Sequence, residues 1–121
     1  PIVIVDFHAE ATSEKTAMAH YLDGRATAVI GTHTHIPTAD AHVTERGTAV
    51  ITDVGMCGPY DSVIGVESNV VLEQLITGLP VRHEVARNDV RISALLVDLD
   101  ASTGRATECR LVQHPDWVRS R

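Results

Sequence analysis

The chain has few aromatic residues, few cysteines and no long apolar run, and each shortage argues against a class of function. Phe, Trp and Tyr make up 3% of the 121 residues, so a surface that stacks single-stranded bases is not expected. The two cysteines, Cys57 and Cys109, have no metal-type spacing and form no disulfide framework, which indicates a reducing, cytoplasmic setting. No apolar run approaches the roughly 20 residues that a membrane-spanning helix needs, and no basic leader with an apolar centre is visible.

Basic residues are also scarce, since 10 Lys and Arg stand against 16 Asp and Glu, giving a formal net charge of −6. Proteins that bind a nucleic-acid polymer depend on many Lys and Arg contacts to phosphates, so such a partner is not expected. A small nucleotide remains compatible with this charge, because a metal ion can hold its phosphate.

The length fits one domain with a moderate core. The chain begins at Pro1, and Ile2–Val5 already has the pattern of a buried strand. Domains rarely start inside a core strand, so residues 1–121 are expected to form the C-terminal part of a single domain. Residues 115–121 are expected to form a polar tail.

The first thirty residues predict a strand, a helix and a second strand. Ile2–Val5 and Ala26–Ile30 are continuous apolar runs typical of strands covered on both faces. A helix is expected to begin at Thr12 or Ser13, with Met18, Tyr21 and Leu22 at helical spacing, and to stop at Gly24. A parallel crossover is the expected packing, which gives an α/β fold class.

Further elements follow from the pattern of the remaining residues. The expected strands are Ala39–Val43, Thr48–Thr52, Arg91–Asp100 and Thr107–Val112. A second helix is expected over Glu67–Thr77, and the Gly- and Pro-rich stretch 55–62 is expected to be an irregular loop.

Three histidines at the ends of the first two strands suggest a metal site. His33 and His35 form a His-x-His pair directly after Gly31, and His8 follows the first strand. Side chains alternate faces along a strand, so His33 and His35 are expected to point to the same side, about 6.5 Å apart along the chain. Ligands of open α/β sheets gather beyond the carboxyl ends of the strands, so His8 should lie near the pair. Two-metal hydrolytic sites bind phosphoryl groups between their ions.

A histidine at a strand end is more often a hydrogen-bonded structural residue, and this alternative applies most strongly to the histidines outside these motifs. Asp6 could donate its carboxylate to a metal ion if the first strand persists through Phe7, although accepting a hydrogen bond from an imidazole N–H is its expected role, and the role of Glu10 is equally open. Asp40 and Asp53 lie at strand edges, where turn-forming aspartate is common. The residues considered for supporting the ligands or contacting substrate are Asp6, Glu10, Thr32, Asp40 and Asp53.

Other His-x-His enzymes fit less well. Amidohydrolase barrels need about 250 residues of repeating strand and helix. Metallo-β-lactamase-type sites continue the pair to Asp-His, whereas here Ile36-Pro37-Thr38 follows.

Several motifs, taken in order, resemble those of the bacterial calcineurin-like metallophosphoesterases of the YmdB-like group, described as 2′,3′-cyclic-nucleotide 2′-phosphodiesterases. The resemblance covers most of residues 2–78. The matching stretches are Asp6-Phe7-His8-Ala9-Glu10-Ala11-Thr12-Ser13-Glu14-Lys15, Tyr21-Leu22-Asp23-Gly24-Arg25, Gly31-Thr32-His33-Thr34-His35, Thr38-Ala39-Asp40, Thr52-Asp53-Val54-Gly55-Met56 and Gly58-Pro59-Tyr60-Asp61-Ser62-Val63-Ile64-Gly65.

This resemblance implies the C-terminal part of a four-layer αββα sandwich with a dinuclear site, iron or manganese being the expected metals. It implies that His8 and His33 bind one metal and His35 the other, and that a metal-bound hydroxide attacks the phosphorus of a small cyclic nucleotide. The family's Asp, bridging Glu, Asn and catalytic His lie on its N-terminal half, which is absent from this sequence. No catalytic residue is therefore expected here, and the isolated chain is expected to be inactive.

Two functional hypotheses remain open. In the first, the chain is part of a metal-dependent cyclic-nucleotide phosphodiesterase and needs the missing N-terminal half of its domain as a partner. In the second, it is a non-catalytic metal-binding or assembly module that pairs through exposed strands. Assembly into a homo-oligomer is expected in addition.

Overall fold

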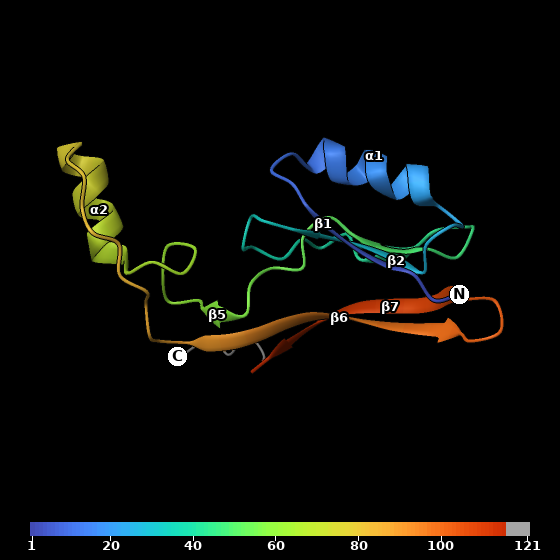
Figure 1. Cartoon of the computed structure of the whole chain (residues 1–121). Coiled ribbons are helices and arrows are strands. Elements are labelled where there is room, and N and C mark those ends of the chain that lie inside the picture. The colour runs from blue at the N-terminus through green and yellow to red at the C-terminus, as the bar shows by residue number, and fades with distance from the viewer. Residues whose placement is uncertain (116–121) are drawn as a thin grey trace.

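The computed structural model describes residues 1–115 and has an α/β architecture (Figure 1). In chain order the elements are β1 Ile4–His8, α1 Thr12–Leu22, β2 Ala28–Thr32, β3 His42–Val43, β4 Ala49–Ile51, β5 Gly58–Pro59, α2 Ser68–Thr77, β6 Val90–Asp100 and β7 Arg105–His114. Apart from Pro115, the polar tail predicted for 115–121 lies outside the described residues. In the part described, neither helix is long and apolar enough to cross a membrane.

The first sheet has the strand order β1-β2-β4-β3, in which only β3 is antiparallel to its neighbour. The parallel crossover expected from β1 through α1 to β2 is confirmed. In its register, Ile4 lies beside Ala28 and His8 lies beside Thr32. The two strands therefore end side by side, and the residues that follow them share one edge of the sheet.

The first sheet is covered on one face by α1 and on the other by the long hairpin of β6 and β7 (Figure 1). Val29 and Val50 pack against Ala19 of the helix, with Met18 and Leu22 around them. Ala28 and Ala49 point the opposite way and contact Ala106 of β7. Helix, sheet and sheet thus form three successive layers, as expected for part of an αββα sandwich.

Between β5 and β6 the chain leaves these layers as an arm, residues 60–89, that carries α2 (Figure 1). No residue of this helix is buried. Its C-terminal end at Gly78, in the left-handed conformation at φ +67°, is as predicted. Leu75 and Ile76 are 74% and 82% exposed, so the helix adds nothing to the core of the described chain.

Several predicted details are wrong, and the structure shows the reason for each. The first strand begins at Ile4 and is not buried as predicted: β1 is an edge strand of its sheet, with side chains that alternate between exposed and half-buried; Ile4 is 54% exposed. Of the three residues at helical spacing, Met18 and Leu22 pack against the core, whereas Tyr21 is 68% exposed, with the guanidinium of Arg25 over its ring. The stretch 55–62 contains the short strand β5, which pairs with β6 by long-range hydrogen bonds that a local pattern does not reveal.

Candidate metal-binding site

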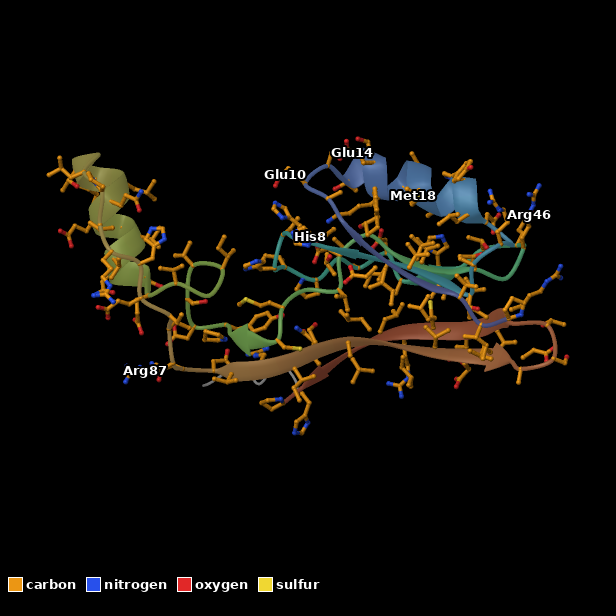
Figure 2. The ribbon with its side chains drawn as sticks, viewed as in Figure 1. His8, Glu10, Glu14, Met18, Arg46 and Arg87 are labelled. Carbon is orange, nitrogen blue, oxygen red and sulfur yellow. The ribbon has the colours of Figure 1, made fainter. Side chains whose placement is uncertain are left out.

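The candidate site lies beyond the carboxyl ends of β1 and β2, where Figure 2 shows His8 and Glu10 beside the start of α1. Since β1 persists through Phe7 to His8, the side chains of Asp6 and His8 share one face of that strand. The shared face required of Asp6 and His8 is thus present, and the role of Asp6 in metal binding stays a prediction.

A threonine connects Asp6 to His8. The hydroxyl of Thr32 donates to Asp6 Oδ1 at 2.8 Å, and the same oxygen lies 3.0 Å from His8 Nδ1. Because the single hydroxyl proton is given to Asp6, the Thr32 oxygen accepts from His8 Nδ1–H. This arrangement leaves the lone pair on His8 Nε2, the nitrogen that faces His33, and a fixed tautomer of this kind is what a metal-binding histidine requires.

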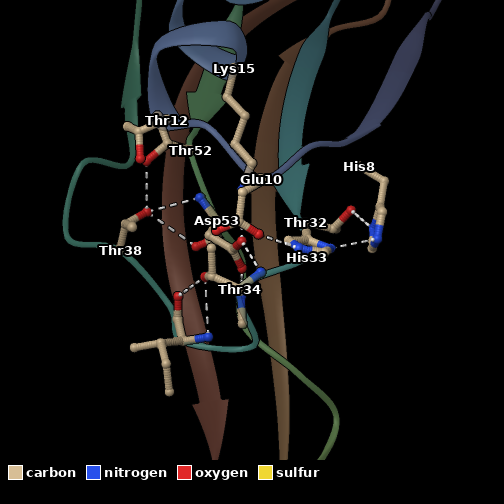
Figure 3. A network of polar contacts seen from close by, with 12 residues as sticks. His8, Glu10, Thr12, Lys15, Thr32, His33, Thr34, Thr38, Thr52 and Asp53 are labelled. Carbon is tan, nitrogen blue, oxygen red and sulfur yellow. Dashed lines mark hydrogen bonds and ion pairs between the residues drawn. The ribbon is translucent and has the colours of Figure 1, made fainter. Parts of the chain in front are cut away.

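Figure 3 shows His33 between His8 and Glu10, in contact with both. Its Nδ1 lies 3.0 Å from His8 Nε2, and its Nε2 lies 2.5 Å from Glu10 Oε2. The two imidazole rings meet edge to face, with centroids 4.8 Å apart. His33 and Glu10 are 40% and 83% exposed, so this network is open to solvent in the described chain.

The expectation that β2 continues through the His-x-His pair is wrong. The strand ends at Thr32, and His33 and His35 adopt φ values of +117° and +69°. These values turn the backbone away from the strand direction at both positions. A positive φ is also unfavourable for residues with a Cβ. The two imidazoles therefore have separate environments instead of pointing together from one strand face.

His35 contacts the arm. Its Nδ1 lies 2.8 Å from the carbonyl oxygen of Ile64. A carbonyl can only accept, so His35 carries its proton on Nδ1 and leaves the lone pair of Nε2 available. Ile64 itself has a φ of +47°, a rare value for a β-branched residue. Sequence reasoning missed this partner because it lies 29 positions away in an irregular loop.

Asp53 lies beneath the His33–His35 turn, paired with a buried lysine. Lys15 Nζ is 2.8 Å from Asp53 Oδ2, and the two side chains are 3% and 1% exposed. Burial acts to raise the pKa of Asp53. The hydrogen bonds from Lys15 and from the amides of Thr34 and Gly55 outweigh this effect, so the pKa lies below its usual value. Lys15 was also missed by sequence reasoning, because a lone lysine on a helix is normally solvated.

Asp40 has a structural role at the next turn. Its Oδ1 accepts hydrogen bonds from the hydroxyl of Thr38 at 2.6 Å and from the amide of Thr52 at 3.2 Å. Partial burial opposes ionisation, but these hydrogen bonds outweigh it and lower the pKa of Asp40. The aspartate thereby fastens the segment after the histidines to the end of β4, in keeping with the turn-forming role considered above.

The donor set fits a metal ion in part. His8 Nε2 and His33 Nδ1 face each other at 3.0 Å, and these two imidazole nitrogens would hold the ion. No group of three or more His, Cys, Asp or Glu side chains within residues 1–115 is spaced to hold a metal ion. Metal binding by His8, His33 and His35 stays a prediction.

Known proteins with similar sequences match nearly the whole of this chain. A family model described as YmdB-like protein matches residues 1–112. A 2′,3′-cyclic-nucleotide 2′-phosphodiesterase of Bacillus subtilis is 49% identical over 108 residues, which are 89% of this chain and 41% of that protein.

Two crystal structures share the fold. A hypothetical protein from Thermus thermophilus superposes with a TM-score of 0.86 at 46% identity, over 93% of this chain and 44% of that one. A phosphatase of Mycoplasma pneumoniae gives a TM-score of 0.87 at 39% identity, over 93% and 40%. The chain thus spans about two-fifths of the length of these relatives.

Proposed function

Because the chain belongs to the YmdB-like family, we propose that it forms part of a metal-dependent phosphodiesterase that hydrolyses small cyclic nucleotides. The observation that carries this proposal is the approach of His8 Nε2 and His33 Nδ1 to 3.0 Å, at the edge where the two parallel strands end. The names of the relatives, a cyclic-nucleotide phosphodiesterase and a phosphatase, support the same reaction class.

In this proposal His8 and His33 hold one metal ion and His35 holds a second, iron and manganese being the candidates. Bound metal ions would supply a water molecule acidic enough to act as nucleophile and positive charge for the phosphoryl oxygens. Thr32 and Asp6 keep the proton of His8 on Nδ1, and the Ile64 carbonyl does the same for His35. Glu10 accepts from the outer nitrogen of His33 and so restrains its ring.

The experiment compares alanine variants of the complete natural protein, using Mn²⁺ titration and hydrolysis of 2′,3′-cyclic AMP. Replacement of His33 or His35 by Ala should lower activity by more than about 100-fold, beyond the range usual for residues that only support ligands. His83→Ala is the matched control, since His83 binds Gln74 on the arm. Full activity in the His33 or His35 variant would show that the ligand assignment is wrong.

A second part of the experiment uses the 121-residue chain alone. Because its donors are three neutral imidazoles, we expect weak Mn²⁺ binding and no hydrolysis. Stoichiometric binding of two metal ions with turnover would refute the expectation that the isolated chain is inactive. Metal binding without hydrolysis by the complete natural protein would instead favour a non-catalytic module.

A further inference from the structure

The turn that carries His33 and His35 cannot be held by its own backbone preferences. Both histidines adopt positive φ, at +117° and +69°, and L-residues with a Cβ rarely adopt such values unless surrounding contacts impose them. The residue between them, Thr34, is therefore the point where an outside contact would fix both histidines at once.

Asp53 supplies that contact. Its Oδ2 accepts the amide of Thr34 at 2.9 Å, and its Oδ1 accepts the amide of Gly55 at 2.9 Å. The backbone of Asp53 is itself held, because its amide donates to the hydroxyl of Thr38 and its carbonyl accepts the amide of Thr38. The carboxylate is thus fixed at the end of β4, a central strand, and directed at the middle of the turn.

Lys15 also holds this carboxylate in place. Its Nζ contacts the same Oδ2 that accepts the Thr34 amide, and both charged groups are almost completely buried. The lysine stem passes over Gly31, where a Cβ would come within 2.9 Å of Lys15 Cδ and 1.8 Å of the Thr52 carbonyl oxygen. Figure 3 shows Lys15 reaching from α1 to Asp53, to one side of His33 and His8.

We propose that the buried Lys15–Asp53 pair is a positioning pair, which ties the His33–His35 turn to α1 and β4 and so sets the separation and orientation of the two histidines. The inference rests on the proposed function in one respect, namely that these histidines bind metal. The pair itself touches neither metal nor substrate: Asp53 acts through the Thr34 amide, and Lys15 acts through Asp53.

The test compares Asp53→Ala, Asp53→Asn and Lys15→Met in the complete natural protein by Mn²⁺ titration. Asp53→Ala removes the acceptor for Thr34 and should weaken Mn²⁺ binding about 10- to 100-fold, the usual effect of losing a group that orients a ligand. Asp53→Asn should recover part of this loss, because its amide oxygen can still accept the Thr34 amide. Lys15→Met should also weaken binding, since the carboxylate loses the cation that directs it.

Asp100→Ala is the matched control. Asp100 also accepts side-chain and backbone hydrogen bonds, from Ser102 in the turn between β6 and β7, so its loss should leave Mn²⁺ affinity unchanged. If Asp53→Ala folds and binds Mn²⁺ within twofold of the unsubstituted protein, the positioning role is refuted. Equal losses for Asp53→Ala and Asp53→Asn would likewise contradict it, because the Thr34 contact would then be irrelevant.

A structural readout keeps the test independent of metal and of the variants' stability. In the unsubstituted chain, NMR should show a through-hydrogen-bond correlation between the Thr34 amide nitrogen and Asp53 Cγ; its absence overturns the proposal. In a folded Asp53→Ala variant, the cross-peaks between the His8 and His33 rings should be lost. If these NMR results hold while the unsubstituted protein binds no Mn²⁺, the positioning role stands and the proposed function fails.

Discussion

Gly31 shows how a single residue controls the approach of three elements. It ends the apolar run of β2, and its missing side chain leaves room for the carbonyl of Thr52 and the stem of Lys15. The sequence places this glycine before the histidines, but only the structure shows that it serves close packing. Its φ is not positive, so the requirement is one of space.

Gly31→Ala should therefore destabilise the chain by at least about 2 kcal/mol, because the new Cβ would lie 1.8 Å from the Thr52 oxygen and the backbone must move. Urea unfolding followed by circular dichroism measures the change. Gly58→Ala is the control, since its nearest neighbour would be Met56 Sδ at 3.8 Å; it should change stability by less than about 0.5 kcal/mol. Equal midpoints for the two variants would contradict the close-packing explanation.

At the scale of elements, the contact between the two sheets depends on small side chains. Ala28 and Ala49 of the first sheet are completely buried, and Ala106 of β7 is 5% exposed against them. With alanine on both sides, the hairpin can approach the sheet closely, and Val97 and Cys109 fill the space around this contact. A larger residue at its centre would separate the layers.

Ala106→Leu is expected to cost about 1 to 3 kcal/mol of unfolding free energy, the usual range for overpacking a dense core. Chemical denaturation of the 121-residue chain measures it. The same substitution at Ala94, exposed on β6 opposite Val112, should be tolerated. A stable Ala106→Leu variant with unchanged midpoint would mean that the layers are not tightly packed.

The elements that could be predicted from the sequence are those with a local signal. Apolar runs, a helical spacing and Gly78 located both helices and the β6–β7 hairpin to within a few residues, and the strand–helix–strand start located the edge where the histidines lie. The contacts that shape the site were not predictable in this way. Lys15 meets Asp53 across 38 positions and His35 meets Ile64 across 29, and no local pattern records such pairings.

For the molecule as a whole, stability should be concentrated in the three layers. The central strands β2 and β4 contain the largest of the fully buried aliphatic side chains, Val29 and Ile51, whereas α2 buries none of its residues. Backbone amides in densely buried regions exchange their hydrogens with solvent only when the whole protein unfolds. Amides in sparsely buried regions exchange through local fluctuations.

Native-state hydrogen exchange followed by NMR should show this division directly. The amides of β2 and β4 should exchange slowest, at the rate set by global unfolding, and those of Leu72–Thr77 should exchange many times faster. Lowering global stability with mild denaturant should accelerate the first group and leave the second unchanged. Equal protection of both groups would show that the arm is part of the cooperative unit.

The two ends of the outer part of the arm lie side by side. Val66 bridges Val85, and the amide of Glu67 donates to the carbonyl of Glu84 at 2.9 Å, so the chain returns to the place where it departed. Residues 68–83 are therefore a closed insertion with adjacent ends, the arrangement most easily shortened, exchanged or extended. Ile64, which restrains His35, lies before this closure, so the insertion is free to vary in length while the histidine keeps its partner.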